Sequence, residues 1–289
     1  QAGLTPYIPH WKKTLDENGL DESFYCDNPD DWFCNEVVPG IYSIRSMEDS
    51  LWQWTINSEL RKAKKDGTFS YRYSDLGFYI MKKLVERQTR QSIESFLDQN
   101  FYQPLGTSRL TFFPLAHFDM EEIAPTEKDN YFRNTTIRGV VHDQGAAMLG
   151  GVGGHAGLFS NSLELAKIMQ MNMNGGVYGG RRYLKENTIN TFTERHFKYN
   201  RRGIGWDKPL RSGNGPSSDL CSYSTFGHTG FTGTSMWADP EYGLIFVFLS
   251  NRIHPDANNR KLIKQNIRTR IQDIVYESIF VNDLNKANK

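Results

Sequence analysis

The chain has 289 residues, which is enough for one large domain or two closely packed ones. Its formal net charge is +1, so the composition lacks the strongly basic balance typical of nucleic-acid-binding proteins. No run of residues approaches the roughly 20 apolar positions that a membrane helix needs, and the most apolar segment, 244–249, predicts a short buried strand.

The first part of the chain predicts a loop region followed by helices. Prolines interrupt residues 1–45, which predicts irregular structure there. A helix is expected after Ser46, with its end marked by a lysine-rich turn and then by Asp66 and Gly67. Two more helices are expected over 76–85 and 92–101, and residues 107–140 predict extended, loop-rich chain.

The second part of the chain mixes helices with short strands. Helices are expected over 162–173 and 188–192. The segments 203–206, 227–238 and 244–250 alternate with turns, which predicts an antiparallel meander, and a helix over 258–280 closes the chain. The predicted class is therefore α+β, with a mostly helical, loop-rich lobe at 1–150 and an antiparallel-sheet lobe at 151–289, packed as one unit around a cleft.

The most informative motif is His228-Thr229-Gly230, at the start of a strand-like segment rich in glycine and hydroxyl groups. A glycine-lined strand edge lets a ligand lie against backbone N–H groups, which can stabilise a developing negative charge. A side chain able to carry a positive charge at the same edge can bind a carboxylate. The motif therefore indicates a strand edge that can bind a ligand carrying a carboxylate or a developing negative charge.

This segment resembles the Lys-Thr-Gly element of the penicillin-binding protein and β-lactamase superfamily, in a His-Thr-Gly form. Residues 71–77 resemble the Tyr-x-Asn element of its class C β-lactamase and esterase branch, with Asp75 at the third position. Residues 1–5 resemble its His-x-Ser-Gly-Leu segment, and residues 141–143 with 150–160 resemble a glycine-rich region of envelope members. The four stretches follow the order of that family, so a β-lactamase/transpeptidase-like fold is expected.

The family's nucleophile, the Ser of Ser-x-x-Lys, has no counterpart in the chain, because no serine is followed by lysine three residues later. The expectation is that the nucleophile helix and the N-terminal strands lie upstream of Gln1, and that the chain alone is inactive. A larger parent polypeptide is consistent with this interpretation.

The resemblance assigns roles to six residues. Tyr73 would act as general base or proton relay, and Asp75 would accept a hydrogen bond from the lysine partner but could not donate one to a substrate carbonyl. His228 would bind the substrate carboxylate as a cation and shuttle protons, so that binding weakens above neutral pH. Thr229 and Gly230 would line the substrate, and the N–H of Phe231 would be one oxyanion donor.

Further expectations follow from the resemblance. The substrate would be a peptidoglycan-type peptide, a β-lactam or a small ester, with no cofactor or metal, in a bacterial periplasm, envelope or extracellular setting. One alternative is a non-catalytic binding module of the same fold. A second is a metal-dependent hydrolase that uses His142, Asp143 and His155, although their spacing matches no tight metal motif.

The three cysteines leave one question open. Cys26 and Cys34 flank a loop-like stretch and could form a disulfide in an oxidising compartment or remain two thiols. Cys221 lies in no motif that would make it a nucleophile.

Overall fold

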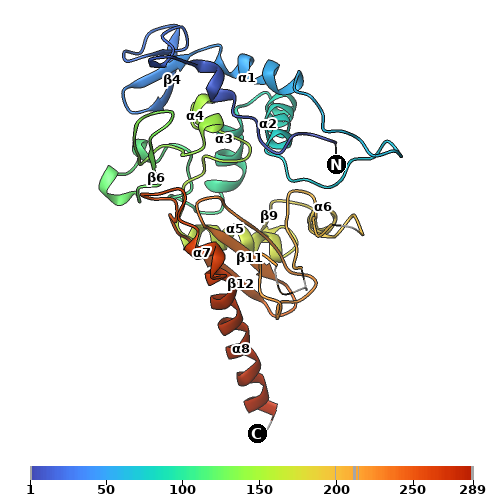
Figure 1. The fold of residues 1–289 in the computed structure, drawn as a ribbon. Helices are drawn as coiled ribbons and strands as arrows, with labels where there is room; N and C mark the ends of the chain where they lie inside the picture. The colour runs from blue at the N-terminus through green and yellow to red at the C-terminus, as the bar shows by residue number, and fades with distance from the viewer. Residues whose placement is uncertain (1, 199, 211–212, 214, 288–289) are drawn as a thin grey trace. The chain divides into compact units, whose positions relative to one another are not determined.

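The computed structural model describes residues 2–198, 200–210, 213 and 215–287, with residues 281–287 described by their backbone alone. The chain divides into two compact units (Figure 1). Unit 1 comprises residues 1–102 and 108–159, and unit 2 comprises 103–107 and 160–289. The division near residue 160 rather than 150 has a structural reason, because Phe159 still forms an antiparallel bridge with Thr111 inside unit 1.

Unit 1 begins with a small sheet where irregular structure was expected. Strands β3 (Tyr25–Cys26), β4 (Phe33–Val38) and β5 (Ile41–Ile44) pair antiparallel in the order β3-β5-β4. The register between β4 and β5 shifts twice, so β4 lacks the regular alternation by which strands are recognised in sequence. A 3-10 turn over His10–Thr14 and the hairpin of β1 (Leu15–Asp16) and β2 (Gly19–Leu20) precede this sheet.

Two longer helices in unit 1 position the residues of interest. Helix α1 covers Met47–Ile56, and it is shorter than predicted because the chain after it runs extended, with Arg61 N–H bonded to the carbonyl of Gly3 at 2.8 Å. Helix α2 covers Leu76–Thr89, close to the prediction. The predicted helix at 92–101 is split into α3 (Ile93–Leu97) and one π-helical turn, Asp98–Tyr102.

The rest of unit 1 consists of short elements around a shared core. Strands β6 (Glu127–Asp129) and β7 (Thr135–Ile137) form a hairpin, followed by α4 (Gln144–Met148). The ion pair of Arg133 with Asp129 is fully buried at 3.0 Å, and the same guanidinium donates to the carbonyl of Val141 at 2.7 Å. These bonds satisfy the buried charge and fix the segment that leads into α4. The 3-10 turns Pro114–Ala116 and Met120–Glu122 complete the unit.

Unit 2 is built on an antiparallel meander whose strands differ from the prediction, because the segment 227–238 forms two strands joined by a turn at 230–234. Strands β10 (Phe226–Thr229), β11 (Ser235–Asp239) and β12 (Leu244–Phe248) pair antiparallel in that order. Helix α5 (Ser162–Met173) packs against β11 and β12, and its Met169 joins Phe226 and Ala238 in a buried cluster. The predicted strand at 203–206 is absent, since this part pairs only through a bridge between Asp207 and Gly227.

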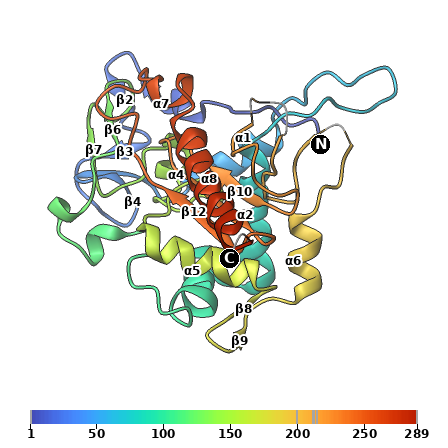
Figure 2. The same cartoon turned by 90° about the horizontal axis from the view of Figure 1, so that it is seen from below.

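The remaining elements of unit 2 are a hairpin and three helices. They are β8 (Val177–Tyr178), β9 (Arg181–Arg182), α6 (Glu186–Thr193), α7 (Lys261–Lys264) and α8 (Ile267–Ala287). The predicted terminal helix is broken at Asn266, whose φ is 48°, a left-handed conformation that ends α7. Helix α8 bonds to the sheet through Tyr276 and Asp239 at 2.7 Å and then runs past the strands (Figures 1 and 2).

Cys26 and Cys34 lie on β3 and β4, on opposite sides of β5. Strands two places apart in a sheet are separated by about 10 Å, which exceeds the Cα separation of a disulfide. Both thiols are free, so the open question is resolved in favour of two separate cysteines. Among the described residues, no helix is long and apolar enough to cross a membrane.

Candidate functional site

Two of the motif segments expected from the sequence lie side by side in unit 1. The N–H of Asp75 donates to the carbonyl of Pro6 at 3.0 Å, and the hydroxyl of Ser74 donates to that of Thr5 at 2.7 Å. The side chain of Arg61 holds the same segment through the carbonyl of Leu4 at 3.1 Å. Residues 2–7 therefore brace the start of α2, while Gln1 lies outside the described residues.

Tyr73 and Asp75 interact directly at this point. Tyr73 is partly exposed, and its side chain hydrogen-bonds the carboxyl group of Asp75. Asp75 precedes α2, but its side chain makes no capping bond, so a simple capping role does not account for it. Burial raises the pKa of Asp75, the charge of His155 lowers it, and that of Asp143 raises it, so that the pKa lies above its ordinary value.

His142, Asp143 and His155 do not form a metal site. Within the described part of the chain, no three His, Cys, Asp or Glu side chains are grouped as ligands. Asp143 instead accepts hydrogen bonds from Nε2 of His155 and from the N–H of Ala146, each at 2.8 Å. The second bond caps α4, so this carboxylate is used within the fold.

In unit 2, the hydrogen bonds of His228 define a neutral ring. Its Nδ1 lies 2.8 Å from the carbonyl of Thr229, which can only accept, and its Nε2 lies 2.7 Å from a guanidinium nitrogen of Arg202, which can only donate. Nδ1 therefore carries the proton and Nε2 is an acceptor. Burial lowers the pKa of His228, the Thr229 carbonyl raises it and the charge of Arg202 lowers it, with a net decrease.

The expected role of His228 as the cation that binds a substrate carboxylate stays a prediction. Beside it, Arg202 carries a positive charge, and an arginine stays charged at every physiological pH. Sequence reasoning missed Arg202 because it lies 26 positions before His228. The one available signal was the pair Arg201-Arg202 directly before the glycine-containing stretch 203–206.

Asp207 orients this pair of arginines. Its carboxylate lies 2.7 Å from Nε of Arg201 and 3.5 Å from a terminal nitrogen of Arg202. Its backbone bonds to Gly227 in both directions, at 2.8 and 3.0 Å, which attaches the arginine segment to β10. Two positive charges and one negative charge leave a net positive charge beside His228.

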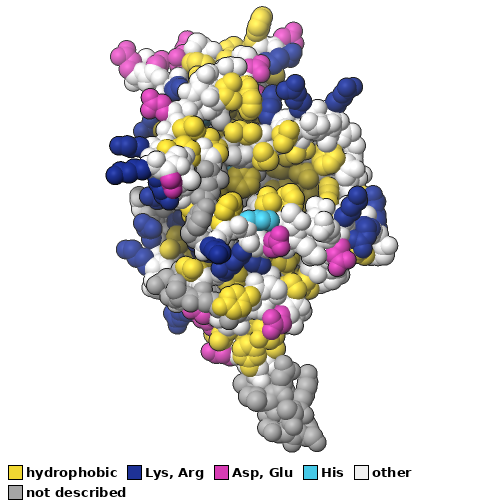
Figure 3. Space-filling view, turned by 90° about the vertical axis from the view of Figure 1, so that its right-hand side faces the viewer, with side chains coloured by type: hydrophobic (Ala, Val, Ile, Leu, Met, Phe, Trp, Pro, Cys, Tyr) yellow, Lys and Arg dark blue, Asp and Glu magenta, His cyan; other side chains and the backbone are white. Residues whose placement is uncertain are grey.

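The strand edge after His228 turns sharply toward β11. Gly230 N–H donates to the carbonyl of Thr234 at 2.8 Å, and a Cβ at Gly230 would lie 2.3 Å from the Thr234 hydroxyl. A larger residue at this turn would therefore require the Thr234 side chain to rotate away. Phe231 is 63% exposed, and the guanidinium of Arg252 lies over its ring at 5.0 Å. Figure 3 shows one face of the molecule with several such groups of exposed hydrophobic side chains.

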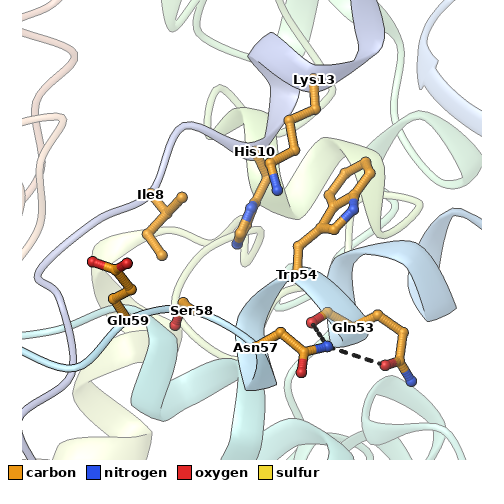
Figure 4. A pocket seen from close by; sticks show the side chains of 8 residues that line it. All are labelled: Ile8, His10, Lys13, Gln53, Trp54, Asn57, Ser58 and Glu59. Atoms are coloured by element: carbon orange, nitrogen blue, oxygen red, sulfur yellow. Dashed lines mark hydrogen bonds between the residues drawn. The ribbon is translucent and has the colours of Figure 1, made fainter.

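Tyr73 and Asp75 belong to unit 1, whereas His228, Thr229, Gly230 and Phe231 belong to unit 2. The convergence of the two groups in one cleft stays a prediction. A separate pocket of about 290 Å³ lies within unit 1, lined by residues from 8–13 and 53–59, and Figure 4 shows His10 between Ile8 and Trp54 there. None of the six residues assigned from the sequence lines this pocket.

Comparison with known proteins places most of the chain in one family. The model of the Beta-lactamase family matches residues 19–268. A protein of Escherichia coli K12 named "Putative D-alanyl-D-alanine carboxypeptidase" is 36% identical over 203 residues, covering 65% of this chain and 47% of that protein. A protein of the same name from Salmonella gallinarum is also 36% identical, covering 66% and 47%. The chain thus spans about half the length of these relatives.

Solved structures show the same fold at low sequence identity. The LovD9 mutant of simvastatin synthase from Aspergillus terreus matches with a TM-score of 0.54 and 16% identity, covering 81% of this chain and 61% of that one. EstCE1, described as a hydrolase with promiscuous acyltransferase activity, matches with a TM-score of 0.51 and 17% identity, covering 72% and 56%.

Proposed function

Since the chain belongs to the Beta-lactamase family, we propose that it contributes to the active site of a serine hydrolase that transfers the acyl group of peptidoglycan-type peptides. The family and the α+β, β-lactamase/transpeptidase-like fold inferred from the motifs are both confirmed. The relatives named as D-alanyl-D-alanine carboxypeptidases support the choice of substrate class. A bacterial envelope location is part of the same proposal.

In the proposed reaction, a serine attacks the peptide carbonyl and an acyl-enzyme forms, which water then hydrolyses. Tyr73 would move the proton of the serine, and the carboxyl group of Asp75 would hold the Tyr73 hydroxyl in place. Thr229 and Gly230 would align the substrate along β10, with the N–H of Phe231 as one oxyanion donor. The chain itself contains no Ser-x-x-Lys, so the serine would come from residues outside it.

The observation that carries the substrate assignment is the 2.7 Å bond between Arg202 and His228. A carboxypeptidase substrate ends in a free carboxylate, and a guanidinium next to the Thr229-Gly230 edge provides a permanent positive charge for it. Binding should therefore persist above neutral pH, unlike binding to a charged histidine. A small neutral ester would gain nothing from this charge.

Binding of two matched peptides tests this assignment without requiring catalysis. One peptide ends in D-alanyl-D-alanine with a free carboxylate, and the other has the same sequence with a terminal amide. Calorimetry should show at least tenfold tighter binding of the acid by the wild-type chain, and Arg202→Met should remove the difference. Equal affinities for the two peptides in the wild-type chain would contradict the proposal.

A covalent probe separates the enzyme from a non-catalytic binding module of the same fold. The chain alone should not be acylated by penicillin-like or fluorophosphonate probes, as measured by intact mass, because no serine has the Lys partner. A polypeptide extended by the coding sequence upstream should be labelled once per molecule if that sequence supplies Ser-x-x-Lys. Stoichiometric labelling of a serine within residues 1–289 would refute this part, and an unlabelled extended polypeptide would favour the binding module.

A further inference from the structure

Three segments that are distant in sequence meet at the first turn of α4. Asp143 accepts from the N–H of Ala146 and from Nε2 of His155, each at 2.8 Å. Tyr79, one turn after Asp75 on α2, stacks on the His155 ring with centroids 4.6 Å apart and planes at 19°. His155 thus connects α4 and the glycine-rich segment 150–157 to the start of α2.

Two glycines make this close packing possible. A Cβ at Gly145 would lie 1.8 Å from the hydroxyl oxygen of Tyr79, and a Cβ at Gly154 would lie 2.3 Å from the carbonyl oxygen of Phe78. Both distances are shorter than any real contact, so a side chain at either position would displace α2 from α4 or from the glycine-rich segment. Of the glycines in the motif at 150–160, Gly154 is explained by this contact.

The same cluster buries His155 beside the carboxylate of Asp143. The side chain of His155 is only 4% exposed. Burial lowers the pKa of His155, but the hydrogen bond and charge of Asp143, and the charge of Asp75, raise it above its ordinary value. Within the described chain its Nδ1 has no hydrogen-bond partner, so Asp143 sets the direction of the ring. Burial and the charges of Asp143 and Asp75 also raise the pKa values of Tyr79 and Tyr7.

We propose that His155, held by Asp143 and stacked on Tyr79, is a positioning residue that holds the start of α2 against α4, and through α2 keeps the carboxyl group of Asp75 in place beside Tyr73. The importance of this positioning for catalysis rests on the proposed function, in which Tyr73 would transfer the proton of the serine. The geometric part concerns unit 1 alone.

Two variants of His155 and one control test this inference. His155→Phe keeps a ring for Tyr79 to stack on but removes the charge and the bond to Asp143. His155→Gln keeps a donor for Asp143 but has neither charge nor ring, and it serves as a second variant if Phe impairs folding. Val37→Ala is the control, because Val37 is 1% exposed in the core of unit 1 and its truncation lowers stability without removing a charge, a ring or a hydrogen bond of His155 or Asp143.

The readout is the titration of the Asp75 carboxyl carbon, followed by NMR in the 289-residue chain. Both His155 variants should raise the pKa of Asp75 by about one unit or more relative to wild type, because an opposite charge nearby lowers a carboxyl pKa by about that amount. Val37→Ala should leave it unchanged. The chemical shifts of the Tyr73 ring should move in the two His155 variants and not in the control.

Each outcome decides the inference. An unchanged Asp75 titration in both His155 variants would overturn it, and so would an equal shift in Val37→Ala, because the effect would then follow stability alone. If Asp75 shifts as expected but the wild-type chain does not discriminate the acid peptide from its amide, the proposed substrate fails while the positioning role stands.

Discussion

The neutral state of His228 depends on burial of its ring and on a neighbouring positive charge, so removal of that charge should change its titration. Arg202 donates to Nε2 of His228 at 2.7 Å, which blocks the position where a second proton would bind. Arg202→Met keeps much of the aliphatic length of the side chain and removes both the donor and the charge. We expect the pKa of His228 to rise toward, or above, the ordinary value of histidine near 6.5.

The magnitude follows from the geometry. Two unit charges about 4 Å apart interact by about 4 kcal/mol at an effective dielectric constant near 20, which sets a ceiling of about three pKa units. Asp207 lies 3.5 Å from Arg202, and its negative charge acts on His228 in the opposite direction, so it already cancels part of the effect. Burial of the ring is unchanged by the substitution and continues to lower the pKa. We therefore expect a rise of about one to two units.

The assay is NMR titration of the His228 ring carbons between pH 4 and 9. Arg201→Met is the matched control, because Arg201 also pairs with Asp207 and its charge acts on His228 less than that of Arg202. The control should shift the pKa of His228 less than Arg202→Met does. The same pKa in wild type and Arg202→Met, or equal shifts in the two variants, would refute the role assigned to Arg202.

Two further predictions concern stability. Gly154→Ala should lower the free energy of unfolding by about 1–3 kcal/mol or more, because its Cβ would meet the backbone of Phe78. Gly77→Ala, in α2, should raise the free energy of unfolding by up to about 1 kcal/mol, because its Cβ would have no atom within 4 Å. Denaturant unfolding should therefore give changes of opposite sign for the two variants, and changes of equal sign would contradict the packing argument. Burial raises the pKa of Asp143, but the hydrogen bond and charge of His155 lower it to about 2. The ionised Asp143 should therefore stabilise the folded state by about 2 kcal/mol above pH 3.8, and this stabilisation should be lost as the pH falls toward 2. Asp143→Asn should abolish this acid-dependent loss in unfolding measured from pH 2 to 5, and an unchanged slope in the variant would exclude the ion pair as its cause.

The sequence alone determined the helices and strands that depend on residues close together in the chain. The antiparallel pair of β11 and β12 follows from apolar segments joined by a turn at 239–243, whereas the division of the predicted segment 227–238 into β10 and β11 was not predicted. Helix α5 begins where Asn161 accepts from the N–H of Glu164 at 3.0 Å, a cap that is local to four residues. The order of the motifs, which also is a property of the linear chain, was enough to indicate the family.

Contacts between distant residues decided the rest. Helix α1 ends at Ile56 because the chain after it bonds to residues 3 and 4. Strand β4 is bulged, so its sequence lacks the alternation of apolar and polar residues that would have predicted its pairing with β5. The charge state of His228 depends on Arg202, and the direction of His155 depends on Asp143. Hydrogen bonding and desolvation act over a few ångströms in space regardless of separation along the chain, so ionisation and orientation at these residues are set only when the tertiary structure brings the partners together.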